Sequence, residues 1–277
     1  MLFSRSSIEL EKPLIIRKTN IERVTEGRFL GVIVDEGLTW TRHIKTIQSK
    51  MSRYVGVMYK IKKLLPIKAR IQLYHSFIQS HINYCSLVWG FSAKSNIETL
   101  FRAQKKGMRA VAPGFVNYFY KDGNLPSHTK SYFKEFDILT VHSIIVLNAL
   151  LFLEKVRTFP LTLPDSIRST IRHDAPSHTS TLETCREWES DFNTNIYRPT
   201  VFFKGPLLTT IDEIGSGLSM DNKYNFYQFK SKTKARLREV QNAGDEIEWE
   251  AHNFILFNIS GLRKSNRVTQ TLAVSEN

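Results

Sequence analysis

The residues whose types best suit phosphoryl-transfer chemistry are three adjacent acid pairs, Asp35-Glu36, Asp212-Glu213 and Asp245-Glu246. Two-metal phosphoryl transfer needs at least two carboxylates held close together on rigid elements. The chain of 277 residues contains no Asp-Asp pair and no Asp-x-Asp spacing. Neighbouring side chains of a strand point to opposite faces, so such a pair converges only in a turn. Asp35-Glu36-Gly37 has the composition of a turn itself. We therefore expect no catalytic residue and no metal site in this chain.

The histidines and cysteines give two further candidate constellations. His173, His178 and Cys185 lack a fourth partner at ligand spacing, and structural zinc sites have four ligands. Cys85 and His81 could pair as nucleophile and base, but both fall on or beside an apolar helix face, which favours burial. Only two cysteines and no apolar leader segment indicate an intracellular protein, cytoplasmic or nuclear.

The charge distribution is the strongest signal in the composition. The formal net charge is +13, and residues 41–110 hold 14 Lys and Arg against one acid, Glu98, whereas residues 1–40 hold 6 of each sign and residues 111–277 hold 19 of each. A segment with so few acids repels itself unless an anion lies close to it. A nucleic-acid surface is the favoured interpretation. A solvated basic face without a ligand, an acidic protein partner and a membrane surface remain alternatives.

Aromatic residues are interleaved with these cations, a combination that stacks bases while cations hold phosphates. Trp40 and His43 stand at the start of the basic segment and are the first aromatic candidates for contact, whereas Tyr54 and Tyr84 fall on apolar faces. The candidate nucleic-acid-binding residues are Trp40, His43, Lys45, Lys50, Arg53, Lys60, Lys62, Lys63, Lys105 and Lys106.

The apolar periodicity predicts the elements that carry these residues. Residues 13–18 and 29–34 have strand composition, with a turn at Thr19-Asn20 and room for a short third strand at 21–24. Apolar residues spaced by three and four then predict a helix from residue 43 until Pro66, a second from 67 to about 90, and a third that starts in a capping box at 95–98 and ends before Pro113.

The remaining chain is predicted to be less regular. Residues 138–156 are apolar but interrupted by polar side chains, which favours a buried core helix over a membrane span. Residues 157–222 show little periodicity, and a last basic helix covers about 222–240, with cations at Lys230, Lys232, Lys234, Arg236 and Arg238.

The predicted fold is therefore mainly α, with a small N-terminal antiparallel β-hairpin, a helical bundle and an irregular C-terminal region with one or two helices. We expect four parts: a hairpin at 1–40, a basic three-helix bundle at 41–112, a buried helical connector at 113–160, and a C-terminal region at 161–277 that is partly irregular or disordered.

Several blocks in order resemble one known family. "FLGVIVDEGLTWTRHI" (29–44) resembles the box that follows the palm of reverse transcriptases from non-LTR, LINE-type, jockey-like retrotransposons. "LYHSFIQSHINYCSLVWG" (73–90) and "IETLFRAQKKGMRAV" (97–111) resemble the thumb blocks of that family, at similar spacing. "FKEFDILTVHSIIVLNALLFLEK" (133–155) and "FYQFKSKTKARL" (226–237) resemble its C-terminal region. The resemblance covers most of residues 1–240.

The resemblance implies a palm-end hairpin that helps to seat a primer, followed by a thumb that clamps a template–primer duplex of RNA or DNA. It implies a role like that of the primer grip for Phe29, Leu30, Gly31 and Asp35. The catalytic Y/F-x-D-D box of the family lies upstream of residue 1, so fingers, most of the palm and both metal-binding acids are missing. The complete enzyme uses Mg²⁺, whereas this chain alone is expected to hold no cofactor and to be inactive.

One departure lies near the C-terminus. The family usually has Leu-Trp-Asn after Gly-Pro, but Gly205-Pro206 is followed here by "LLTT". The leading hypothesis is a C-terminal fragment of an RNA-directed DNA polymerase that contributes template–primer binding, with the missing palm and fingers as its partner and no membrane. The alternatives are a stand-alone nucleic-acid-binding module and a non-functional retroelement remnant.

Overall fold

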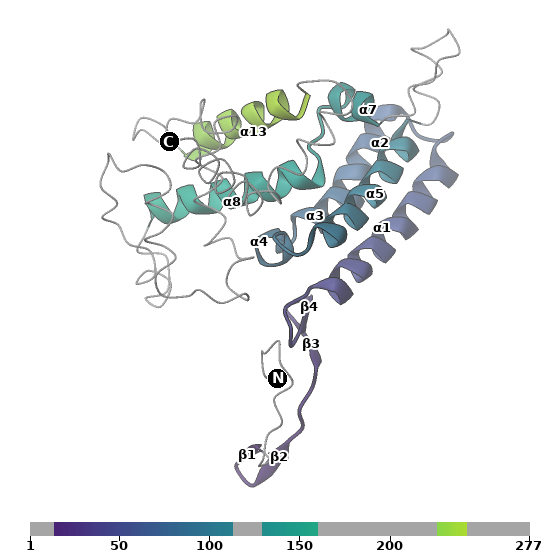
Figure 1. Ribbon diagram of the computed structural model, residues 1–277. Helices are drawn as coiled ribbons and strands as arrows, with labels where there is room; N and C mark the ends of the chain where they lie inside the picture. The colour runs from purple at the N-terminus through teal and green to yellow at the C-terminus, as the bar shows by residue number, and fades with distance from the viewer. Residues whose placement is uncertain (1–13, 113–128, 160–225, 243–277) are drawn as a thin grey trace, which may run out of the picture.

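The computed structural model describes residues 14–112, 129–159 and 226–242. These residues form two small hairpins followed by helices that share a single hydrophobic core (Figure 1). The predicted fold class, mainly α with a small N-terminal antiparallel β region, is confirmed, although two hairpins stand where one was predicted. The proposed division into four parts stays a prediction.

The first hairpin pairs β1 (Leu14–Ile16) with β2 (Thr19–Ile21) in antiparallel register. Its two turn residues, Arg17 and Lys18, both have positive φ, at 49° and 66°. The turn predicted at Thr19-Asn20 is wrong, because these residues lie in β2. Figure 1 shows this hairpin projecting away from the helices.

The second hairpin pairs β3 (Glu26–Phe29) with β4 (Val32–Asp35). The single strand predicted over 29–34 is wrong, because Leu30 and Gly31 form a turn in its middle with φ of 46° and 81°. A two-residue hairpin turn of this kind needs positive φ at both positions, which glycine adopts without steric cost. β4 leads directly into the first helix.

The basic segment begins with α1 (Thr41–Ile61). Four residues of its predicted apolar face are buried, Ile44, Ile47, Met51 and Met58, and His43 and Val55 are buried beside them. Tyr54, Ile61 and Leu65, which were predicted for the same face, are only half-buried. The helix ends at Ile61, five residues before Pro66, and the amide of Leu64 donates to the carbonyl of Ile61 in the turn that follows. Proline disfavours the α conformation in the residue before it, so the helix cannot continue through Leu65.

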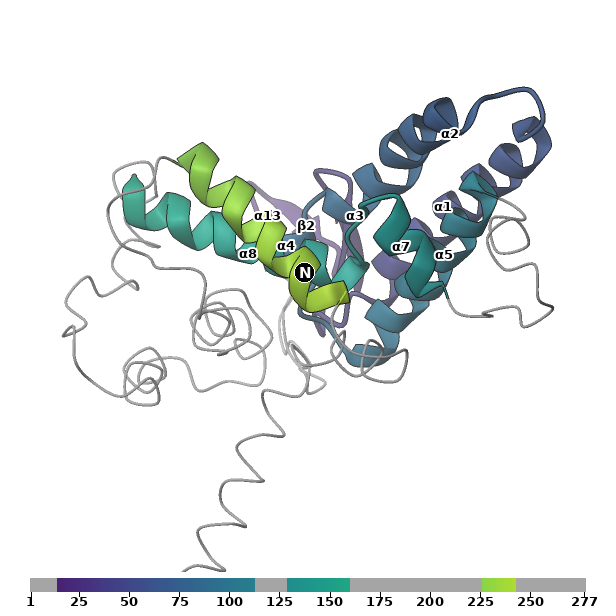
Figure 2. The same ribbon diagram turned by 90° about the horizontal axis from the view of Figure 1, so that it is seen from above.

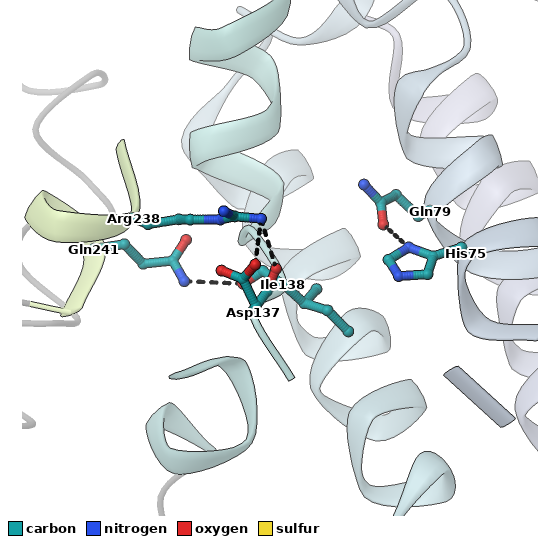
Figure 3. A network of polar contacts seen from close by, with 6 residues as sticks. All are labelled: His75, Gln79, Asp137, Ile138, Arg238 and Gln241. Carbon is teal, nitrogen blue, oxygen red and sulfur yellow. Dashed lines mark hydrogen bonds and ion pairs between the residues drawn. The ribbon is translucent and has the colours of Figure 1, made fainter. Parts of the chain in front are cut away.

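The second predicted helix is broken into pieces: α2 (Ile67–Tyr74), a π-helical turn η1 (His75–Gln79), α3 (Ser80–Asn83) and α4 (Ser86–Trp89). Within η1, the side chains of His75 and Gln79 are hydrogen-bonded (Figure 3).

The break before α4 has a tertiary cause. Tyr84 is extended and Cys85 has φ of 52°. The Tyr84 hydroxyl donates to the carbonyl of Leu30 at 2.6 Å, and the Trp89 indole donates to the carbonyl of Tyr84 at 3.0 Å. These bonds hold Tyr84 out of the helix and against the second hairpin.

The third helix, α5 (Lys94–Val111), packs along α1. All the residues that its spacing predicts for the apolar face are buried: Ile97, Leu100, Phe101, Gln104, Met108 and Val111. The predicted capping box is wrong, because the helix starts before Ser95 and has no side-chain cap. Asn96 instead donates to the carbonyl of Thr39 at 3.0 Å, which joins the start of α5 to the chain before α1.

The last helices are α7 (Lys130–Glu135), α8 (Val141–Thr158) and α13 (Phe226–Asn242). The first half of α8 is almost wholly buried, as predicted for a core helix. Within the described residues, no helix combines the length and apolarity that a membrane crossing requires. Figures 1 and 2 show α13 lying along α8, and the rest of the predicted C-terminal region lies outside the described residues.

Two glutamines fix the segment between α7 and α8. The Gln104 side chain of α5 donates to the carbonyl of Leu139 and accepts from the amide of Val141, both at 2.9 Å. It also donates to the Tyr74 hydroxyl at 2.8 Å. All these groups are buried, so their bonds replace those that water would supply. From α13, Gln241 binds the backbone of the same segment.

Candidate nucleic-acid interface

A groove of about 520 Å³ lies between the second hairpin and α1. Four of its residues are cations, Arg28, Arg42, Lys45 and Arg53, and one is an acid, Glu26. Within the described residues, none of these four cations forms an ion pair. The full lining consists of Glu26, Gly27, Arg28, Ile33, Arg42, Lys45, Thr46, Ser49 and Arg53.

The α1 side of this groove follows from helical spacing. Arg42, Lys45, Ser49 and Arg53 are separated by three, four and four residues, which puts them on one face of the helix. This face lies opposite the buried stripe that contains Met51, so core packing fixes its direction. The cations therefore line the groove as a row along α1.

The joint between β4 and α1 sets the angle of the groove walls. The Asp35 carboxylate accepts from the amide of Thr39 at 2.8 Å and from the amide of Trp40 at 2.9 Å. Leu38 and Trp40 have positive φ, at 49° and 63°. The Asp35 side chain therefore supports a strained backbone, and its predicted role like that of the primer grip stays a prediction.

Glu36, the second acid of the Asp35-Glu36 pair, is engaged in an ion pair. Glu36 accepts from Arg23 in an ion pair of 3.3 Å. No group of three or more His, Cys, Asp or Glu side chains gathers anywhere in the part of the chain that the structure describes. The two other acid pairs, and His173, His178 and Cys185, lie outside the described residues.

The structure places Trp40 and His43 inside the joint, at exposed fractions of 9% and 4%. The amide of Ile33 in β4 donates to Nδ1 of His43 at 3.3 Å, and the His43 ring lies 6.2 Å from that of Trp89. Burial, with a smaller contribution from Lys50, lowers the pKa of His43. The His43 ring ties β4 to α1, and the Trp40 side chain belongs to the buried core. The predicted contact of both residues with nucleic acid stays a prediction.

The tip of the second hairpin is open to solvent. The exposed fractions of Phe29 and Leu30 are 70% and 73%. Gly31 is also exposed, and the Tyr84 hydroxyl fixes the Leu30 carbonyl. Phe29 and Leu30 thus expose apolar side chains at the tip of a hairpin whose strands line the groove. The role of Phe29, Leu30 and Gly31 like that of a primer grip stays a prediction.

The structure brings together only some of the predicted cations. Lys45 and Arg53 line the groove, while Lys50 is half-buried near His43 and His81. Lys60, Lys62 and Lys63 cluster at the far end of α1, where the ammonium of Lys62 lies 5.5 Å from the ring centre of Tyr59.

On α5, Lys105 lies 4.4 Å from the ring centre of Phe101, and Lys106 is exposed. Arg28 and Arg42 are groove residues that sequence reasoning missed. The spacing of Arg42 to Lys45 and Arg53 could have identified it, but nothing local marks Arg28.

Cys85 and His81, considered above as a nucleophile and its base, make no hydrogen bond with each other in the described structure. His81 stacks on Tyr54 at 5.6 Å between ring centres, and burial lowers its pKa, with a smaller effect from Lys50. Cys85 is half-buried at the break before α4.

The described residues thus form a basic helical scaffold with a cationic groove at the joint with a hairpin. In a comparison with curated proteins, the chain is 22% identical over 102 residues to the probable RNA-directed DNA polymerase from transposon X-element of Drosophila melanogaster. The match covers 36% of this chain and 11% of that protein. It supports a loose relationship to reverse transcriptases of transposons. No family model and no solved structure matches the chain.

Proposed function

We propose that this chain is a fragment related to the reverse transcriptases of non-LTR retrotransposons, and that it binds a template–primer duplex through the groove between the second hairpin and α1. The groove is the observation that carries the proposal. It gathers four cations, without ion pairs among the described residues, on two elements that the core holds in a fixed relation.

The electrostatics of the groove favour a polyanion. Like charges held on neighbouring turns of α1 repel one another, and a phosphate backbone removes that repulsion by placing anions between them. Arginine and lysine contacts to phosphate fix the position of a duplex without selecting its sequence. The expected activity is therefore sequence-independent binding with a strong dependence on salt.

The apolar hairpin tip extends this surface. Phe29 and Leu30 follow the groove residue Arg28 at the exposed hairpin tip, where a primer terminus would find an uncharged contact. The residues proposed to hold the duplex backbone are Arg28, Arg42, Lys45 and Arg53, with Lys60, Lys63 and Lys106 as outlying cations.

The chain alone should add no nucleotides to a primed template. This expectation follows from the proposed relationship, since the catalytic acids of such enzymes lie in the palm. Incorporation of labelled nucleotides by the purified chain, in Mg²⁺ and above a mock preparation, would contradict it.

A salt titration of binding tests the proposed groove. The double variant Arg42→Gln/Lys45→Gln removes two phosphate contacts, and on a DNA primer–template duplex the log–log salt slope should fall by about 1.8, at about 0.9 per contact. The matched control Lys134→Gln/Lys155→Gln removes two exposed cations of α7 and α8 and should keep the slope of the unmodified chain. Equal slopes for the two double variants would overturn the groove assignment.

A further inference from the structure

The last described helix, α13, carries a second concentration of cations that the groove does not include. Its 17 residues hold five Lys or Arg and one acid, Glu239. Lys230, Lys234 and Arg238 follow one another at intervals of four, so they form a row on one face of the helix. Burial lowers the pKa of Lys234, with smaller lowering contributions from Arg238 and Lys230 and an opposing one from Asp137.

One exposed aromatic ring extends this row. Tyr227 precedes Lys230 by three residues and therefore lies on the same face. Its exposed fraction is 78%, higher than that of the other exposed Phe and Tyr residues that the structure describes. The Phe226 ring meets the Tyr227 ring edge-on, at 6.3 Å between ring centres. A row of cations beside a solvent-exposed aromatic ring can hold phosphates and stack one unpaired base.

The apolar stripe of α13 is already occupied. Phe229, Thr233, Leu237 and Gln241 recur every four residues and are buried, and α13 packs on α8. A basic amphipathic helix binds a membrane by inserting its apolar face. Because that face belongs to the protein core here, α13 presents only its polar face, which argues against a lipid surface as the ligand.

Two side chains of α13 fix the helix to the body (Figure 3). The Arg238 guanidinium lies 2.5 Å from the Asp137 carboxylate, and the Gln241 side chain donates to the carbonyl of Ile138 at 3.0 Å. Gln241 also accepts from the amide of Thr140 at 2.9 Å. The row is therefore held in one orientation, with Arg238 paired to Asp137 and Lys230 exposed.

We propose that the face of α13 formed by Tyr227, Lys230, Lys234 and Arg238 is a second nucleic-acid site, which binds a single strand by phosphate contacts and one stacked base. It rests on the proposed function only for the class of ligand. Figures 1 and 2 show α13 away from α1, so the two sites contact different parts of a bound nucleic acid.

The test uses the full chain and an unstructured single-stranded RNA. Lys230→Gln/Lys234→Gln should lower the log–log salt slope by about 1.4, at about 0.7 per contact on a single strand. Tyr227→Ala should weaken RNA binding about tenfold without changing the salt slope, and Tyr227→Phe should keep the affinity of the unmodified chain. Lys134→Gln/Lys155→Gln is again the control. Should the double variant fail to fold, the single variant Lys230→Gln, at an exposed side chain, should lower the slope by about 0.7.

The outcomes separate this site from the groove. An unchanged slope in the α13 variant, together with a reduced slope in Arg42→Gln/Lys45→Gln, would overturn the second site and leave the groove. The reverse result would support the second site and count against the groove. Loss of binding to phosphatidylserine vesicles in the α13 variant, with RNA binding unchanged, would overturn the proposal in favour of a lipid surface.

Discussion

The helical body buries its polar and apolar side chains against partners, whereas the tip of the second hairpin exposes its apolar side chains to solvent. In the body, Gln104 and Gln241 pair with buried backbone groups, and large apolar residues from α1 to α13 share one core. At the hairpin tip, Phe29 and Leu30 leave most of their apolar surface in solvent. The body thus accounts for stability, while the joint between the two regions holds the cationic groove. Binding should therefore depend on residues that contribute modestly to stability.

The largest expected effect breaks the body. Gln104→Leu leaves the Leu139 carbonyl, the Val141 amide and the Tyr74 hydroxyl without their partner, and each unpaired buried group costs about 1–3 kcal/mol. We expect the free energy of unfolding to fall by about 3 kcal/mol or more, measured by urea denaturation. Gln241→Leu strands two backbone groups and should cost less. A smaller loss for Gln104→Leu would contradict this ranking.

The next effect is a pH dependence of the body. Burial, with smaller contributions from Lys105 and Lys94, lowers the pKa of His142 from 6.5 to about 3. The folded state then keeps His142 neutral while the unfolded chain takes up a proton, so stability is full above about pH 6.5 and declines as the pH falls toward 3. The loss should approach about 1.4 kcal/mol per pH unit. Urea unfolding of His142→Leu should show a flatter decline, and equal pH slopes would contradict the assignment.

A third change loosens the joint. Asp35→Ala removes the acceptor for the amides of Thr39 and Trp40, and the loss of a comparable cap costs about 1 kcal/mol. Duplex binding should weaken as well, since the groove walls lose their fixed angle. Asp35→Asn keeps an acceptor oxygen and is the matched control. Normal duplex affinity in a folded Asp35→Ala variant would show that the joint does not shape the groove.

The smallest effect on stability is expected at the hairpin tip. Phe29→Ser/Leu30→Ser changes side chains that are largely exposed, so the free energy of unfolding should stay within about 0.5 kcal/mol of the parent value. Thermal unfolding would show such a small change as a Tm close to that of the parent chain. A loss of several degrees in Tm would mean that the tip contributes to the core, and the contrast between the two regions would fail.

Sequence predicted the body better than the joint. The buried stripe of α5, including Gln104, was predictable, because residues spaced by three and four lie on the one helix face that packs on the core. The turn at Leu30-Gly31 was hidden inside an apolar run. The break at Tyr84 and Cys85 was not predictable from local signals, because contacts with Leu30 and Trp89 impose it.

The groove shows the same division. Lys45 and Arg53 were identified from the charge of their segment, while Arg28 comes from a segment of balanced charge and joins them only through the fold. Trp40 and His43 are aromatic residues that suit both contact and core; both are buried, and their predicted contact with nucleic acid stays a prediction.

Lysine footprinting measures the central claim at a single residue. An amine-reactive reagent should modify Lys45 in the free chain and leave it protected when a DNA primer–template duplex is bound, while exposed Lys134 reacts equally in both states. This pattern is what a duplex seated in the groove between the second hairpin and α1 predicts. Full reactivity of Lys45 at saturating duplex would show that the nucleic acid binds elsewhere.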